Sequence, residues 1–325
     1  MAVLTSNKYA TLADVLSRMD EAGNIAPIAE VLNKALPILD DIGFVEANMT
    51  DGYLHTVRTG LPAPTWRKLY GGVQPTKSAT AQVKDSFGNL EAYAEVDKDV
   101  ADINGNTAAW RLSEEAPQIE GMAQAVAETI FYGDTAKNPE RFMGIASRYN
   151  ALDAKKVPSA RNVVSAGGTT SLTSVYFISH DVFHAFYPKG SKAGLSQTDK
   201  GQVTVTKEDG SMYEAYRSHY KWQIGTTLDD WRGCARVCNI DTTAIDGAKL
   251  IENMIKAKNQ IEARYLAKTK IYVSREIMTA LELAALNKSA QCLSIVEAAG
   301  QFKTAFFGIP IQVCDAIVNT ETQVK

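Results

Sequence analysis

Two histidines four residues apart are the first candidates for chemistry in this chain. They lie in the string His180-Asp181-Val182-Phe183-His184. On a helix, two histidines at this spacing share one face and can bind zinc, while an acid between them activates a water molecule. The acid here is the shorter Asp181, and the β-branched and aromatic neighbours favour a strand, which would spoil the helical spacing. We therefore favour a structural role, with a metal-dependent hydrolase as the alternative.

The cysteines give a second possible metal site. Cys234 and Cys238 are four residues apart, whereas Cys292 and Cys314 are distant from them. Structural zinc sites usually show two close pairs of ligands. We interpret these residues as buried free thiols of a protein in a reducing compartment.

Charged clusters are the remaining candidates. Arg217, His219 and Lys221 alternate with aromatic residues and could follow a phosphate backbone. We favour the solvent-exposed face of a strand, because the net charge of −3 shows no basic excess. A group of acids lacks the spacing of a calcium loop and indicates a solvated turn: Asp97, Asp99 and Asp102. We find no glycine-framed nucleophilic serine, phosphate loop or dinucleotide fingerprint.

The composition is that of an ordinary globular protein, with 325 residues that are 45% hydrophobic and 22% charged. This length predicts two or more subdomains, each with its own core. We expect no membrane span, because no run of about 18 apolar residues occurs. We also expect no signal peptide, because the first residues lack a basic end followed by an apolar run.

A long helix at residues 110–132 is the clearest predicted element. Its apolar residues are spaced by three and four, which predicts one buried stripe: Leu112, Ala116, Ile119, Ala123, Val126 and Ile130. A charge at Ile119 should then unfold the protein. Pro117 should bend the helix, and Gly133 should end it in a left-handed cap.

Residues 53–96 are unlike a core. Strands are expected at residues 54–59 and 76–84, but neither face of the second strand is strongly apolar. An isolated two-stranded ribbon is marginally stable in water. We infer that this ribbon projects and is stabilised by something outside its own domain; a long mobile surface loop is the alternative.

Helices and strands alternate irregularly along the rest of the chain. Helices are expected at residues 11–19, 24–39, 241–261 (capped by Asp241) and 275–286. Strands are expected at residues 90–96, 175–178, 182–187, 203–206, 212–224, 231–240, 270–273 and 308–313, with an exposed loop at 188–201. Pro310 indicates that the last strand lies at a sheet edge.

Three strings resemble the major capsid proteins of short-tailed bacteriophages. They are residues 65–75 (TWRKLYGGVQP), 187–195 (YPKGSKAGL) and 215–222 (AYRSHYKW), the last followed by Ile224-Gly225 and Asp230-Trp231-Arg232. The resemblance covers nearly the whole chain. It implies an α+β shell fold like that of phage Hong Kong 97 (HK97-like), with an N-terminal arm, an extended β-hairpin loop, a long spine helix, and peripheral and axial domains.

The resemblance also implies a division of the chain. Residues 1–52 would form the arm and helices, and 53–96 the extended loop with the start of the peripheral domain. Residues 97–149 would hold the spine helix within the peripheral domain. Residues 150–268 would form the axial domain, and 269–325 would return to the axial and peripheral domains.

The implied function is a structural, non-enzymatic subunit without cofactor or metal. It would self-assemble through hexamers and pentamers into an icosahedral virion head enclosing double-stranded DNA, bound without sequence specificity. Assembly would take place in the host cytoplasm, with a scaffolding protein, a portal and a cement or decoration protein as partners, and with no membrane. The loop would lie over one neighbour and the arm would reach another.

Candidate intersubunit contacts are Arg58, Trp66, Arg67, Lys68, Tyr70, Lys77 and Val83. Lys77 is also a candidate cross-link donor. Two alternatives stay open: an encapsulin-like cellular compartment of the same fold, and the metal-dependent hydrolase using His180 and His184.

Overall fold

A computed structural model describes residues 34–105, 107–207, 209–286, 293–298 and 301–325. The predicted helix at 11–19 and residues 24–33 of the next lie outside these ranges. The described chain divides into two units. Unit 1 holds Lys34 and residues 89–127 and 194–223, and unit 2 holds residues 35–88, 128–193 and 224–325.

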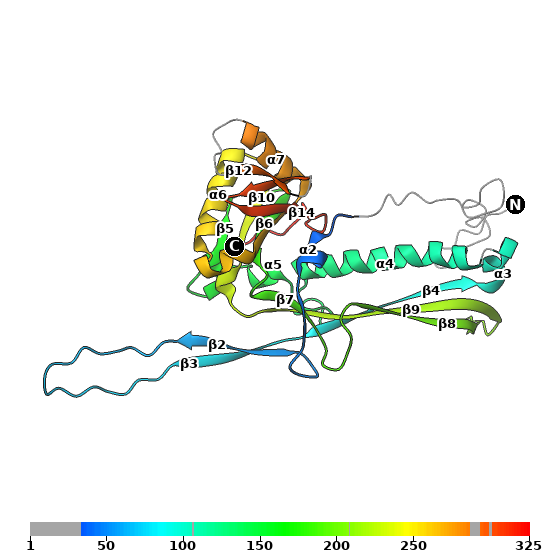
Figure 1. Cartoon of the computed structure of the whole chain (residues 1–325), viewed down its shortest axis with the longest axis horizontal. Helices are drawn as coiled ribbons and strands as arrows, with labels where there is room; N and C mark the ends of the chain where they lie inside the picture. Colours follow the sequence, from blue (N-terminus) through cyan, green and yellow to red (C-terminus); the bar gives the residue numbers. More distant parts are fainter. Residues whose placement is uncertain (1–33, 106, 208, 287–292, 299–300) are drawn as a thin grey trace. The chain divides into compact units, whose positions relative to one another are not determined.

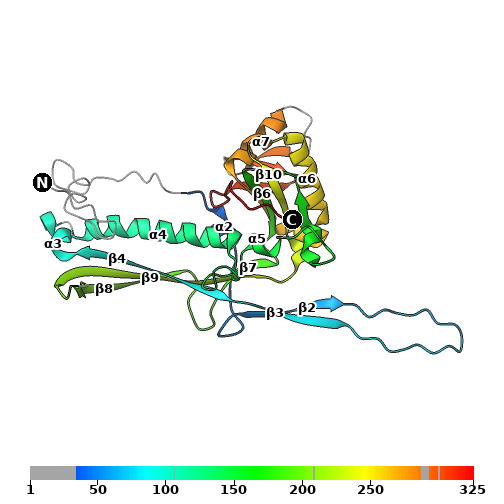
Figure 2. The same ribbon diagram turned by 180° about the vertical axis from the view of Figure 1, so that it is seen from behind.

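Unit 1 is one helix layer on one sheet layer. Its strands are β4 (Phe87–Asp97, from residue 89), β8 (Leu195–Thr206) and β9 (Met212–Leu228, to residue 223). Two short helices, α3 (Lys98–Ala101) and η1 (Ile103–Gly105), follow β4 in the chain. β8 and β9 pair in antiparallel register from Leu195–Trp222 to Thr206–Met212. The helix α4 (Thr107–Tyr132) lies along these strands in both views (Figures 1 and 2).

The helix α4 confirms the predicted long helix and the carboxyl-terminal half of its stripe, where Val126 and Ile130 are buried, but not the amino-terminal half. It begins at Thr107 and is continuous through Pro117. Leu112 and Ile119 are 68% and 41% exposed, so the expectation that a charge at Ile119 unfolds the protein was wrong. The amino-terminal half faces the sheet with polar groups instead, because Arg111 Nη2 lies 2.7 Å from Asp199 Oδ1 on β8 and Glu115 accepts a hydrogen bond from Ser218 on β9.

The core of unit 1 therefore uses other side chains of α4. Trp110 packs with Val96 and Ala101, and Met122 packs with Ala94 and Tyr220.

The end of α4 was predicted correctly, but for the wrong reason. Gly133 does not have a positive φ, so it is not a left-handed cap. Its N–H donates to Thr129 O at 2.8 Å, and a Cβ atom at this position would lie 2.1 Å from Phe142 O. Glycine is needed there because the following chain passes too close for a side chain.

Unit 2 is built around a sheet covered by helices. The strand order is β12 (Leu293–Ala298), β13 (Gln301–Phe306), β14 (Ile309–Val313), β11 (Thr269–Val273), β6 (Leu172–Ser179), β10 (Ala235–Asp241) and β5 (Val163–Ser165). The helices α6 (Gly247–Gln260) and α7 (Arg275–Leu286) lie beside it (Figure 1). Side chains such as Leu250 and Met254 of α6 and Leu281 of α7 join Val175 and Ile271 in one core.

Three details, two in unit 2 and one in unit 1, correct the sequence-based expectations. β14 lies between β13 and β11, so the strand with Pro310 is not at an edge; it pairs with β13 only at two positions next to the tight Phe307-Gly308 turn. The cap of α6 is Asp246, whose carboxylate accepts the N–H groups of Ala248 and Lys249, and not Asp241. The expected loop at 188–201 ends early, because β8 already begins at Leu195.

The remaining strands of unit 2 form two smaller pieces of sheet. β1 (Phe44–Glu46) pairs in parallel with β7 (Phe183–Tyr187), which pairs with the end of β9. β2 (Tyr53–Gly60) pairs with β3 (Ala79–Asp85) in a separate antiparallel hairpin. The short helices are α2 (Pro37–Asp41), α5 (Ile145–Arg148), η2 (Pro158–Asn162), η3 (Trp231–Gly233) and η4 (Ala263–Lys268). None of the described helices has both the length and the apolar character needed to cross a bilayer.

Candidate functional site

The two histidines of the zinc-like string lie on or next to β-strands, and each contacts a different side chain. His180 directly follows β6, and its Nε2 lies 2.9 Å from the hydroxyl of Tyr272. Burial lowers the pKa of His180 to about 4. His184 lies on β7, 3.7 Å from Asp229 Oδ2, and burial lowers its pKa as well. Among the described residues, no three His, Cys, Asp or Glu side chains gather as metal ligands.

The described cysteines are buried thiols. Burial raises the pKa of Cys234 to about 12 and that of Cys238 to about 11. Thiols at such pKa values carry almost no thiolate at neutral pH, so they are poor nucleophiles. Cys292 lies outside the described residues.

The basic side chains on β9 are neutralised by acids of the same unit. Arg217 Nη2 lies 2.6 Å from Glu95, and both His219 and Lys221 approach Glu91, at 3.1 and 3.5 Å. This strand therefore offers no unpaired row of cations for a phosphate backbone.

The acids after β4 serve local structure. Asp97 caps α3 by accepting the N–H of Asp99 at 2.9 Å. Asp102 accepts a hydrogen bond from the hydroxyl of Thr107 at 2.6 Å. Capping and turn roles of this kind are what Asp favours at helix ends.

Among the described residues, the large apolar side chains with the greatest exposure lie on the β2–β3 hairpin. All seven candidate contact residues are exposed, and Trp66 and Tyr70 at its tip are fully so. The tip, residues 61–78, forms no strand and continues beyond the paired ends of β2 and β3 (Figure 1). Large aromatic side chains that are exposed together usually mark an interaction site.

The hairpin also has a one-sided charge. Residues 52–84 contain no Asp or Glu, although the whole chain has a net charge of −3. The basic residues in this range are Arg58, Arg67, Lys68, Lys77 and Lys84. The hairpin is therefore suited to an acidic surface on whatever it contacts.

A tight turn shapes the tip. The N–H of Gly71 donates to Lys68 O at 3.0 Å, and Tyr70 has a φ of 64°. A positive φ at the third position of a turn normally calls for Gly or Asn. A tyrosine there costs about 1–2 kcal/mol relative to glycine, so this turn carries backbone strain.

The base of the hairpin is fixed by its own unit. Asp85 Oδ1 lies 2.8 Å from Arg148 Nη2, and the two side chains are only 7% and 12% exposed. Arg148 also donates to Thr226 O at 2.9 Å. The ring centroids of Tyr53 and Phe186 are 5.6 Å apart. The base therefore holds β2 and β3 in a defined direction within unit 2.

Sequence reasoning missed a buried ionic cluster in unit 2. Arg236 Nη2 lies 2.8 Å from Glu321 Oε2, and Glu321 Oε1 accepts hydrogen bonds from Tyr132 and Tyr176 at 2.7 and 3.0 Å. Arg236 also donates to Tyr149 O at 3.0 Å. The sequence carries no signal for it, since the partners come from distant segments.

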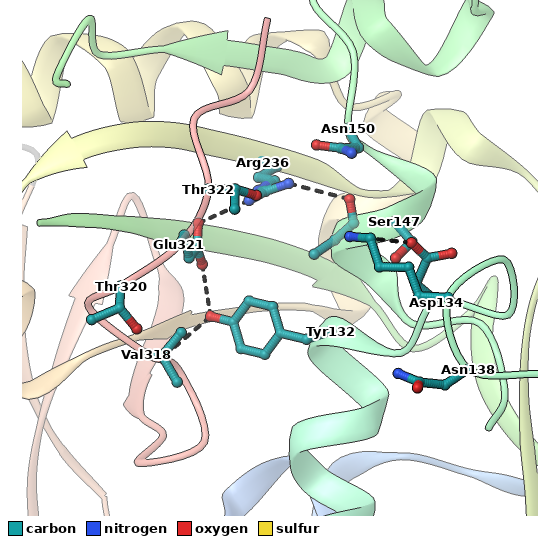
Figure 3. A pocket seen from close by; sticks show the side chains of 12 residues that line it. Tyr132, Asp134, Asn138, Ser147, Asn150, Arg236, Val318, Thr320, Glu321 and Thr322 are labelled. Atoms are coloured by element: carbon teal, nitrogen blue, oxygen red, sulfur yellow. Dashed lines mark hydrogen bonds and ion pairs between the residues drawn. The ribbon is translucent and has the colours of Figure 1, made fainter. Parts of the chain in front are cut away.

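This cluster borders a cavity of about 230 Å³ (Figure 3). Figure 3 shows Arg236, Glu321 and Tyr132 directed toward one another. These groups satisfy one another's hydrogen-bonding capacity, so they attach the segment around Glu321 to α4 and β10. Their polar atoms are therefore not free to bind a ligand.

Comparisons with known proteins agree with this arrangement. The family described as major capsid protein GP7 matches residues 20–325. A chain in a structure of bacteriophage epsilon15 is 33% identical, with 99% of each chain covered and a TM-score of 0.79. A chain of the bacteriophage JBD30 capsid covers 88% of this chain and 93% of its own, at 9% identity and a TM-score of 0.52, and it supports the fold alone. No curated protein matches.

These matches confirm the HK97-like α+β fold expected from the sequence. They also exclude the hydrolase hypothesis, because the matched family is structural, and they favour the phage head over a cellular compartment. The chain belongs to the major capsid protein GP7 family, and it is a non-enzymatic subunit of the icosahedral virion head of a tailed bacteriophage.

Proposed function

We propose that the β2–β3 hairpin is the part of this subunit that joins it to its neighbours in hexamers and pentamers. The observation that carries this proposal is the exposure of Trp66 and Tyr70 on a hairpin whose base is fixed. In this proposal, the tip of one subunit lies over an acidic surface of the next, and Arg58, Arg67, Lys68, Lys77 and Val83 extend the contact.

The residue types at the tip suit such a contact. Trp, Tyr and Arg are the side chains that most often dominate the free energy of binding between proteins. A fixed base reduces the entropy that must be lost when the tip docks. Obligate contacts of this kind typically bury about 2,000 Å² or more. In a closed shell each contact is repeated by symmetry, so modest pairwise strength gives a durable container.

The head formed in this way would enclose double-stranded DNA without sequence specificity. The paired cations on β9 and the net charge of −3 support this, because a wall of unpaired cations would hold the packed phosphates. Assembly in the host cytoplasm, with a scaffolding protein, a portal and a decoration protein, belongs to the same proposal. The buried free thiols suit that reducing compartment.

Shortening the hairpin tests the proposal. Gly60 and Ala79 are register partners, so an Asn-Gly turn can replace residues 61–78 and close the hairpin. We expect a folded subunit that forms no closed shells, as judged by circular dichroism and electron microscopy.

Point variants separate side chains from loop length. The double change Trp66→Ala and Tyr70→Ala should weaken assembly, whereas Gln74→Ala in the same exposed loop should assemble normally. Closed shells from the shortened chain, in normal yield, would show that the tip is not the joining element.

A further inference from the structure

The turn between β13 and β14 carries an exposed aromatic ring. Phe306 pairs with Ile309 across this turn, and the two residues between them, Phe307 and Gly308, have φ values of 48° and 81°. Two positive φ values are typical of a type I′ hairpin turn, whose first central position normally holds Asn, Asp or Gly. The phenyl ring at this position is 52% exposed. The turn therefore accepts backbone strain for a side chain that its own subunit buries only in part.

A cation lies beside this ring. The Nζ atom of Lys258, in the last turn of α6, is 4.7 Å from the centroid of the Phe307 ring. The described ion pairs of α6 use its other lysines, Lys249 and Lys256. Lys258 and Phe307 therefore form a basic and aromatic surface on unit 2, called here the Phe307 surface.

The helix α7 presents the opposite chemistry. Glu282 and Leu283 are adjacent and exposed, Leu283 to 59%. The residues three and four positions away from Glu282 on either side are uncharged, so no ion pair forms along the helix. A carboxylate next to a leucine is complementary in charge and polarity to an ammonium group next to a phenyl ring. Glu282 and Leu283 are called here the Leu283 surface.

The two surfaces lie toward opposite ends of α6. The end of α6 contacts Phe307 through Lys258. The start of α6 packs on α7, since a Cβ atom added to Gly247 would lie 3.0 Å from the Cβ atom of Ala284. Roughly 16 Å of helix separates Gly247 from Lys258. One subunit therefore does not bring its own two surfaces together, whereas a head-to-tail arrangement of copies does.

We propose that the Phe307 surface of one subunit binds the Leu283 surface of the next subunit in the shell. In this contact Lys258 pairs with Glu282, and the Phe307 ring covers Leu283. The occupant is a second copy because this chain builds an icosahedral head, and because a contact between two different surfaces of one chain closes into rings. The contact lies on unit 2 and is separate from the hairpin tip.

Reversing the charges tests the contact. Lys258→Glu alone or Glu282→Lys alone places like charges opposite each other, which should raise the subunit concentration needed for shell formation by about tenfold or more. Light scattering and electron microscopy measure this, and circular dichroism checks that each variant is folded. Combining both changes in one chain should restore assembly. This rescue requires pairing between copies, because the two positions are apart within one subunit.

The same charge change elsewhere on α6 is the matched control. Lys256 is two residues from Lys258, so it lies on a different side of the helix, and it pairs with Glu252 of its own helix. Lys256→Glu should therefore leave the concentration needed for assembly unchanged.

A cross-link measures the proximity of the two surfaces directly. Phe307→Cys and Leu283→Cys in one chain should give disulfide-linked dimers and larger species when assembled shells are oxidised, as seen by non-reducing gel electrophoresis. Either single variant should give none, because the described cysteines of the parent chain are buried.

Three results would overturn the proposal. They are assembly of the Lys258→Glu chain at the parent concentration, a double charge reversal that assembles no better than the single variants, and the absence of linked species from oxidised shells. None of them bears on the hairpin tip, because the shortened hairpin and the Trp66 and Tyr70 variants test that contact separately.

Discussion

The base and the tip of the β2–β3 hairpin differ in how their side chains find partners. At the base, Asp85 and Arg148 form a buried ion pair and Tyr53 packs near Phe186, all within unit 2. At the tip, Trp66 and Tyr70 are fully exposed, and the described hydrogen bonds are confined to the turn around Gly71.

The difference shows two separate tasks on one hairpin. The base contributes to the stability of the folded subunit, because a buried charge needs its partner there. The tip contributes little to that stability, since its side chains are hydrated in the single subunit. Changes at the base should therefore alter folding, and changes at the tip should alter only assembly. The predictions below test this separation.

Removing the cation at the base should have the largest effect. Arg148→Met leaves Asp85 buried without a counter-charge, and we expect the free energy of unfolding to fall by about 3–5 kcal/mol. Chemical denaturation of the unassembled subunit measures this. Adding Asp85→Leu to Arg148→Met removes both charges and should restore much of the loss.

A surface ion pair next to this site is the matched control. Lys84 pairs with Asp51, and both side chains are largely exposed. Lys84→Ala should change the free energy of unfolding by about 0.5 kcal/mol or less. A loss for Lys84→Ala as large as that for Arg148→Met would mean that burial is not what matters at the base.

Acidification should weaken the base by a smaller amount. His184 lies beside Tyr53, His55 and Asp229, and burial holds its folded-state pKa below the unfolded value of about 6.5. Below pH of about 6.5 the unfolded state binds more protons, so stability falls as the pH decreases toward the folded pKa.

Thermal unfolding across this pH range measures the effect. His184→Gln should make the midpoint less sensitive to acid than in the parent chain. His219→Gln, on β9 in unit 1, should leave the acid sensitivity of unit 2 intact. An unchanged pH dependence for His184→Gln would contradict the assignment.

The smallest effect on folding is expected at the tip. Trp66→Ala removes a fully exposed side chain, so the free energy of unfolding should change by less than about 0.5 kcal/mol. Calorimetry of the unassembled subunit provides the measurement. A clear loss of stability in the single subunit would show that Trp66 packs against its own chain and would remove the contrast between base and tip.

Much of the hairpin could be predicted from the sequence. Residues 54–59 and 76–84 read as strands with no strongly apolar face, and β2 and β3 pair at nearly these positions. The exposure of the tip follows from the same pattern. The anchor at the base could not be predicted, because Asp85 and Arg148 are far apart in the chain and neither neighbourhood indicates the other.

The helix α4 also shows how far local sequence predicts structure. Local spacing of apolar residues determined that residues near 110–132 form a helix, since helical periodicity is a property of the chain itself. The same spacing predicted the buried Val126 and Ile130 correctly, but it failed in the amino-terminal half of the helix, where Asp199 and Ser218 approach from β8 and β9 and pair with polar side chains of α4.

The sequence by itself determined the long helix, the strand that begins at residue 212 and an acid-free hairpin without a core face, because these depend on neighbouring residues. The tertiary structure alone decided the buried pairs Asp85–Arg148 and Arg236–Glu321 and the interior position of β14. Such pairings join segments that are distant in sequence, and burial makes a charge depend on one particular partner that no local pattern specifies.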